Sequence, residues 1–178
     1  MRFCETPLAG AILVETESHA DDRGSFYRSF CVREFEAHGL PGAFVQGSVS
    51  RNRQRGTLRG LHWQSNPHPE GKLVRCVRGA AYDVVVDLRP GSTTFCSWFG
   101  TELTDANLTA LYIPPGFAHG FQTLCDDTDI AYQMTEFYVP ELACGARWND
   151  QAFNIRWPLD IAIMSNRDRS FKDFSAIG

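Results

Sequence analysis

Short apolar segments with strand-like patterning recur along the chain, and turn residues separate them. The segments cover residues 11–15, 25–30, 72–77, 82–88, 111–113, 120–124 and 130–134. One short helix is predicted over residues 32–38, and Gly39 follows it where a left-handed residue commonly ends a helix. So many short strands, with no long amphipathic helix, predict an all-β sandwich or barrel.

The length and charge of the chain narrow its organisation and its partners. A chain of 178 residues fits one domain, 1–178, and no repeat or linker divides it. The formal net charge of -4 argues against a nucleic-acid partner, because no basic stripe is available to displace counterions. The tail over residues 158–178 is predicted to form a loop and a short helix packed over the barrel.

The sequence indicates neither secretion nor a membrane span. Residues 1–5 lead straight into mixed sequence, and no apolar run has the length of a span. The six cysteines are scattered and include no C-x-x-C pair, so free thiols are expected instead of a disulfide framework. The expected location is therefore the cytoplasm.

One histidine lies among cations near the middle of the chain. His62 follows Arg59-Gly60-Leu61, and Lys72 begins the next strand-like segment. An imidazole can take a proton at neutral pH, and paired cations can hold an anion. The combination suits proton abstraction from a negatively charged, carbonyl-bearing substrate. The structural alternative is a core histidine beside two surface cations.

A second histidine ends the segment 114–119, which has the pattern P-x-G-x-x-H and turns His119 inward. The pattern resembles the second motif of the cupin superfamily, a double-stranded jelly-roll barrel whose mouth holds a ligand. Metal-binding cupins usually add a histidine pair and a glutamate, where this chain has only His62. Two histidines are too few for a stable metal site, so no metal is expected.

With both motifs together, the chain resembles the nucleotide-sugar 3,5-epimerase family, typified by dTDP-4-dehydrorhamnose 3,5-epimerase. The matching segments are 22–24, 59–62, 71–75, 83–89, 115–120, 147–150, 155–158 and 165–169. They span nearly the whole chain in the family's order. The resemblance implies a jelly-roll cupin barrel with a few short helices, no cofactor, and a homodimer whose N-terminal strands pair across the interface.

The resemblance also implies a reaction, the inversion of C3 and C5 in a nucleotide-linked 4-keto-6-deoxyhexose through an enolate. Its substrate would be dTDP-4-dehydro-6-deoxyglucose and its product dTDP-4-dehydrorhamnose. The family's histidine base corresponds to His62, the carboxylate partner of that base to Asp168, and the tyrosine acid to Tyr132. Lys72 corresponds to the residue that stabilises the charge on the keto oxygen. Taken singly, each of the last three could be structural.

The resemblance assigns further residues to substrate binding. Arg23, Arg59 and Arg167 correspond to cations that hold the diphosphate or the nucleotide. His119 corresponds to a residue that contacts the substrate. Tyr138 corresponds to the aromatic side chain that stacks on the base.

Several nucleotide-contacting positions of the family differ in this chain. Arg28 and Ala143 stand where the family commonly has glutamates, and Gln46-Gly47-Ser48 stands where it has Gln-Asp-Asn. Arg28, Gln46 and Ser48 are still expected to contact the nucleotide or the sugar. A guanidinium donates hydrogen bonds where a carboxylate accepts them, so a weaker preference for dTDP is predicted.

Three alternative functions stay open on the sequence. The first is an epimerase that inverts only C3 or only C5 of a different nucleotide sugar. The second is a sugar 3,4-ketoisomerase on the same barrel, and the third is a cupin that binds a nucleotide sugar without turnover. Asp83 and Asp87 resemble paired carboxylates, but their spacing also suits one face of a strand, and a structural role is favoured for both.

Overall fold

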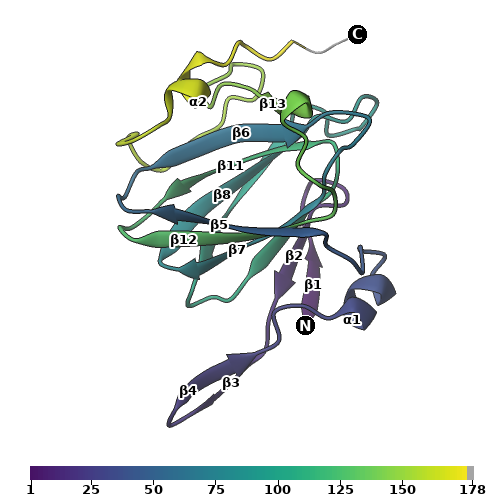
Figure 1. The fold of residues 1–178 in the computed structure, drawn as a ribbon, viewed down its shortest axis with the longest axis vertical. Helices are drawn as coiled ribbons and strands as arrows, with labels where there is room; N and C mark the ends of the chain where they lie inside the picture. The colour runs from purple at the N-terminus through teal and green to yellow at the C-terminus, as the bar shows by residue number, and fades with distance from the viewer. Residues whose placement is uncertain (176–178) are drawn as a thin grey trace.

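Two antiparallel sheets lie face to face in the computed structural model, which describes residues 1–175 (Figure 1). The strand order is β1-β2-β10-β7-β12-β5 in the six-stranded sheet and β13-β6-β11-β8-β9 in the five-stranded sheet. This arrangement is the all-β jelly-roll cupin fold that the sequence predicted.

The bounds of the elements are as follows. The six-stranded sheet contains β1 (Arg2–Glu5), β2 (Ile12–Glu15), β10 (Ala110–Ile113), β7 (Lys72–Arg78), β12 (Thr128–Met134) and β5 (Gln46–Asn52). The five-stranded sheet contains β13 (Ala143–Gly145), β6 (Leu58–Gln64), β11 (Phe117–Thr123), β8 (Ala80–Asp87) and β9 (Trp98–Thr104). The other elements are β3 (Ser18–Asp21), β4 (Gly24–Tyr27), α1 (Val32–Ala37), the 3₁₀ turn η1 (Pro140–Leu142) and α2 (Asn166–Ser170).

Apolar side chains fill the space between the sheets and also cover their outer faces. Val85, Leu111, Phe121 and Ile130 belong to the inner core cluster, in which both sheets take part. The neighbouring Val86 belongs to a separate cluster beneath the chain's last third. Strand β8 is therefore buried on both faces, which explains its unbroken apolar run.

The structure bears out the predicted helix, and each of the seven predicted strand segments overlaps a strand. Helix α1 covers Val32–Ala37, and Gly39 has the left-handed φ of 70° expected after it. Six strands were not predicted: β1, β3, β5, β6, β9 and β13. The tail forms a loop and the short helix α2, which lies over β6, as predicted (Figure 1). The last three residues of that prediction lie outside the described residues.

A hairpin near the N-terminus projects away from both sheets (Figure 1). It consists of β3 and β4, and nearly all of its side chains are exposed. Phe26 at the β4 side is 76% exposed, the largest value among the exposed large apolar side chains. A strand pair with no core of its own is a poor structure in isolation, so this hairpin is a candidate surface for contact with another chain.

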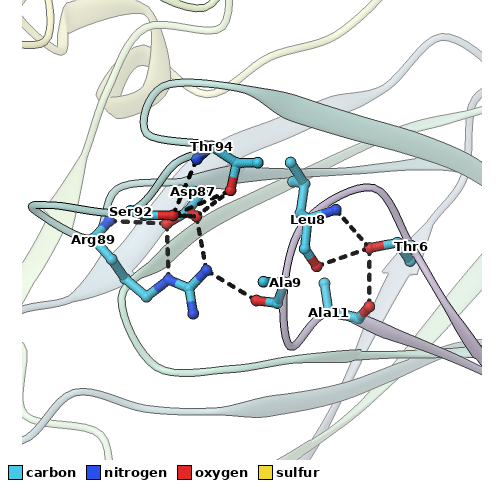
Figure 2. A network of polar contacts seen from close by, with 8 residues as sticks. All are labelled: Thr6, Leu8, Ala9, Ala11, Asp87, Arg89, Ser92 and Thr94. Atoms are coloured by element: carbon cyan, nitrogen blue, oxygen red, sulfur yellow. Dashed lines mark hydrogen bonds and ion pairs between the residues drawn. The ribbon is translucent and has the colours of Figure 1, made fainter.

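A network of polar contacts closes the end of β8 (Figure 2). The Asp87 carboxylate, which is fully buried, accepts bonds from Arg89 Nε at 2.9 Å, Ser92 Oγ at 2.6 Å and Thr94 Oγ1 at 2.7 Å. Arg89 Nη2 also donates to the carbonyl of Ala9 at 2.9 Å, which ties the loop after β8 to the β1–β2 turn. These contacts confirm the structural role predicted for Asp87.

Candidate active site

Strand β6 presents Arg59 and His62 on one face because its pairing with β11 is irregular. His62 lies opposite His119 and Arg59 opposite Phe121, with a register shift between the two pairs. On a regular strand, residues three apart point to opposite faces, and the extra residue of a bulge corrects this. Since Phe121 belongs to the inner core, Arg59 and His62 both lie on the inner side of the barrel.

His62 and Asp168 form a histidine–carboxylate pair. His62 Nε2 lies 2.8 Å from Asp168 Oδ1, while Asp168 Oδ2 accepts a bond from the Gly60 N–H at 3.3 Å. The Asp168 N–H donates to Ser165 Oγ, the N-cap of α2, which fixes the carboxylate over β6. Burial alone would raise the pKa of Asp168, but the bonds and charge from His62, with those from Gly60 and Ser165, hold it below its ordinary value. This carboxylate is therefore charged at neutral pH and orients the imidazole.

A second histidine–carboxylate pair lies inside the barrel beside Tyr132. His119 Nε2 is 2.9 Å from Asp83 Oδ2, and both residues are buried. The Tyr132 ring meets the His119 ring edge-to-face, with 5.9 Å between centroids. Burial first, and then the negative charge of Asp83, raise the pKa of Tyr132 well above its ordinary value, against a lowering by Arg59. The phenol is therefore protonated at neutral pH.

Lys72 faces the same interior from the start of β7. It lies opposite Met134 on β12, two positions from Tyr132, so the three side chains share a sheet face. Lys72 Nζ is 2.8 Å from Glu70 Oε1, and each side chain is only 11% exposed. A largely buried ammonium at this place is suited to an oxygen that gains negative charge.

The predicted nucleotide-binding residues divide into two groups. Gln46 and Ser48 lie on the edge strand β5, where Ser48 is opposite Tyr132. Gln46 Oε1 accepts a bond from the backbone N–H of Tyr138, whose side chain is 52% exposed. Arg59 Nε donates to Asn52 Oδ1 at 2.8 Å, at the other end of β5. This group borders the interior that holds Tyr132.

The second group lies away from the barrel mouth of its own chain. Arg23 pairs with Asp21 at the tip of the projecting hairpin, and its side chain is 90% exposed. Arg28 Nη1 is 3.1 Å from Glu34 Oε1 on α1. The predicted binding set is therefore not brought together within one chain, because the hairpin carrying Arg23 projects outward (Figure 1).

Arg167 lies on α2, one residue before Asp168. Its guanidinium carbon is 5.8 Å from the centroid of the Phe171 ring. The ring of Phe171 in turn meets the His62 ring edge-to-face at 5.9 Å. The tail thus brings Arg167, Asp168 and Phe171 to the strand that carries His62.

Three residues that contact the predicted site residues were not expected to belong to the site. Asp83 was assigned a structural role, although its placement on the inner face of β8 follows from Val85, two positions along. Glu70 had a usable signal, because it lies two residues before Lys72. Phe171 had none, because its contact with His62 depends on how the tail folds back over β6.

Metal ligands, a membrane-spanning helix and further cavities would each indicate another kind of site. Within residues 1–175, no group of three or more His, Cys, Asp or Glu side chains is arranged to hold a metal ion. No helix in the same range is long and apolar enough to cross a membrane. A cavity of about 740 Å³ lies beneath the tail and is lined by Trp63, Cys144, Phe171 and Phe174 among others, but not by His62 or Tyr132.

Comparison with known proteins gives a consistent result. The model of the dTDP-4-dehydrorhamnose 3,5-epimerase family matches residues 5–176. The epimerase of that name from Methanothermobacter thermautotrophicus is 45% identical over 174 residues, covering 96% of this chain and 93% of the relative. A dTDP-4-dehydrorhamnose 3-epimerase from Streptomyces niveus is 37% identical, covering 95% of this chain and 82% of the relative.

Solved structures are similar over the same extent. The dTDP-4-dehydrorhamnose 3,5-epimerase of Bacillus anthracis, with TDP and PPi bound, has a TM-score of 0.94 and 40% identity, covering 97% of this chain and 99% of the other. The dTDP-6-deoxy-D-glucose-3,5-epimerase of Legionella pneumophila, in complex with dTDP-4-keto-L-rhamnose, has a TM-score of 0.91 and 38% identity, covering 97% of this chain and 92% of the other.

Proposed function

This chain belongs to the dTDP-4-dehydrorhamnose 3,5-epimerase family, and we propose that it inverts C3 and C5 of dTDP-4-dehydro-6-deoxyglucose to give dTDP-4-dehydrorhamnose. The observation that carries this proposal is the placement of His62 and Tyr132 on the two opposed sheets of one barrel. An epimerase needs a base on one face of the sugar ring and an acid on the other. We propose that the whole chain, 1–178, is one catalytic domain.

His62 is the proposed base. Its Nε2 is bonded to Asp168, so the N–H lies on Nε2 and the lone pair of Nδ1 is available to the substrate. The side chain is 41% exposed, which allows a sugar to reach it. When the imidazole takes the proton from C3 or C5, Asp168 stabilises the positive charge that results.

Tyr132 is the proposed acid, and Lys72 stabilises the intermediate. A raised pKa keeps the Tyr132 phenol protonated until it delivers its proton to the opposite face of the enolate. Lys72 lies on the same inner face and places its ammonium by the keto oxygen, where the enolate carries its negative charge. No cofactor takes part, because the 4-keto group already makes the C3 and C5 hydrogens acidic.

The remaining predicted residues bind the nucleotide. Arg59 and Arg167 hold the diphosphate, and His119 contacts the sugar from the barrel interior. Gln46, Ser48 and Tyr138 contact the nucleotide, with the exposed ring of Tyr138 stacked on the base.

We propose that the enzyme is a homodimer in which Arg23, at the tip of the hairpin, and Arg28, directly after β4, serve the partner's site. The hairpin is exposed on nearly every side chain, and its Phe26 is 76% exposed. Strand β5 is an edge strand beside the proposed nucleotide site, which leaves its outer side free to pair with another strand. We also propose a cytoplasmic location, because all six cysteines have free thiols.

The test is incubation with dTDP-4-dehydro-6-deoxyglucose in deuterated water, followed by NMR. Deuterium at both C3 and C5, with formation of dTDP-4-dehydrorhamnose, supports the proposal. Inversion at C3 alone favours the narrower activity, which the Streptomyces niveus relative keeps open as a second candidate. Movement of the keto group indicates a ketoisomerase, and binding without exchange indicates a non-catalytic cupin.

A further inference from the structure

Phe171 lies directly after α2 and touches two of the proposed functional side chains. Its ring meets the His62 imidazole edge-to-face, with 5.9 Å between centroids and 71° between planes. The guanidinium of Arg167 lies over the same ring, 5.8 Å from its centroid. One aromatic ring therefore contacts both the proposed base and a residue proposed to bind the diphosphate.

Gly145 leaves the space that the Phe171 ring occupies. It is the residue of β13 that pairs with His62 of β6, so it lies directly beside the base. A Cβ atom added to Gly145 would lie 2.2 Å from Phe171 Cζ and 2.3 Å from Cε2, far inside van der Waals contact. The φ of Gly145 is not in the left-handed region, so the absence of a side chain serves the approach of the ring and not the backbone conformation.

We propose that Phe171 is a positioning residue for the base, holding the His62 imidazole in the plane in which Nδ1 faces the sugar. The proposal rests on the proposed epimerase function. Asp168 fixes Nε2 through one hydrogen bond, but a single bond still lets the ring tilt about the bond axis. The Phe171 ring removes that freedom, because it packs against the imidazole from a second direction.

The Phe171 ring is also held by its contact with Arg167. A cation over an aromatic face is attracted by the ring's negative potential. Arg167, Phe171 and His62 thus form one line of contacts from the diphosphate to the base. Reactions that depend on a positioned base are sensitive to small displacements, and an error of about 1 Å can cost about 10²-fold.

Two substitutions disturb this contact by different routes. Phe171→Leu keeps an apolar side chain but removes the ring, whereas Gly145→Ala keeps the ring and displaces it. The double variant completes a double-mutant cycle, because the effects of two substitutions that disturb the same contact do not add. Phe174→Leu is the matched control, because Phe174 lies in the same tail and packs on Trp63, Phe95 and Phe153, away from His62.

Two readouts separate positioning from a loss of folded protein. Calorimetry with dTDP counts the sites that bind nucleotide, and kcat is then expressed per binding site. NMR of the five histidine imidazoles follows the ring-current shift that Phe171 imposes on His62. A purely structural defect would lower the number of binding sites and leave kcat per site unchanged.

We expect Phe171→Leu and Gly145→Ala each to lower kcat per site by about 10- to 10²-fold. Both should move the His62 resonances, and the double variant should be no slower than the slower single variant. Phe174→Leu should match the wild type in both readouts. If the wild type is active and both single variants match Phe174→Leu in kcat per site, the role of Phe171 is wrong. If the wild type neither exchanges nor inverts C3 or C5, the proposed function itself is wrong.

Discussion

Asparagine at position 168 tests the base most directly, because it keeps the shape of Asp168 and removes its charge. The carboxylate accepts two bonds, from His62 Nε2 at 2.8 Å and from the Gly60 N–H at 3.3 Å. The two donors bond to different oxygens, Oδ1 and Oδ2, and an asparagine has an NH₂ group in place of one of them, so it can accept from only one of the two directions. If the oxygen turns to Gly60, the amide NH₂ faces His62 and forces the N–H onto Nδ1, where the base needs a lone pair.

The size of the effect follows from these two outcomes. A hydrogen bond to a charged group contributes about 1.5–3 kcal/mol. If this stabilisation is lost only in the state with a protonated His62, the activation barrier rises by the same amount and kcat falls by about 10- to 150-fold. With the wrong tautomer, His62 cannot act as the base, and the loss approaches the full contribution of a general base, about 10²–10⁴-fold. We therefore expect Asp168→Asn to lower kcat by at least about tenfold.

The assay is exchange of the C3 and C5 hydrogens in deuterated water, with kcat expressed per dTDP-binding site. Asp150→Asn is the control, because Asp150 is equally buried beneath the tail and accepts backbone bonds from Ala152 and Phe174. It should lower the thermal stability but not kcat per site. Activity of Asp168→Asn within twofold of the wild type would refute the assignment of Asp168 as the partner of His62.

Three further predictions concern the acid, the fold and the nucleotide. Tyr132→Phe should retain part of the hydrogen exchange while blocking inversion, because the enolate can still recover its proton from the face of the base; equal loss of both, seen by NMR, would contradict this. Asp87→Asn should lower the free energy of unfolding by about 3 kcal/mol. This value is the lower end of the range for breaking a buried ion pair, because the Arg89 side chain is one-third exposed. Bonds from Arg89 and its neighbours outweigh burial and depress the pKa of Asp87, so its contribution is complete above about pH 4. The difference between wild type and variant in urea unfolding should therefore shrink as the pH falls below about 4, and a constant difference would be contrary evidence. Arg28→Glu should tighten dTDP binding relative to UDP, GDP and CDP in calorimetry, and unchanged affinities would show that Arg28 does not select the nucleotide.

The sequence predicted strands whose own residues are apolar. It was less informative for segments that become strands only by pairing with a neighbouring strand. Strand β8 was evident from Val84–Val86, which are buried on both sides of the sheet. Strand β5 was missed because it is an edge strand of small and polar residues, and only its seven-residue pairing with β12 makes it a strand. Local propensity carries little of that information.

The candidate site divides in the same way. His62 and His119 could be singled out from local motifs, and Tyr132 and Asp168 only from the family resemblance. A structural role was favoured for Asp83, because residue spacing shows which residues share a face of a strand but not which face lines a site. Asp83 and Asp87 do share a face of β8, yet one lies in the barrel interior and the other closes the strand's end. The position of a residue along its strand decided the role, and that position follows from the packing of the whole barrel.

Two histidine–carboxylate pairs lie side by side on the adjacent strands β6 and β11, where His62 is opposite His119, and they differ in burial. The His62 side chain is 41% exposed, whereas that of His119 is 5% exposed and Asp83 is fully buried. The greater exposure of His62 suits it to the role of the base in the proposed reaction. The His119 pair is turned toward Tyr132 instead, where the charge of Asp83 favours the neutral phenol. In the proposed reaction, one carboxylate thus favours a protonated imidazole and the other a protonated phenol, and both forms are required between the removal of a proton from one ring face and its return to the other.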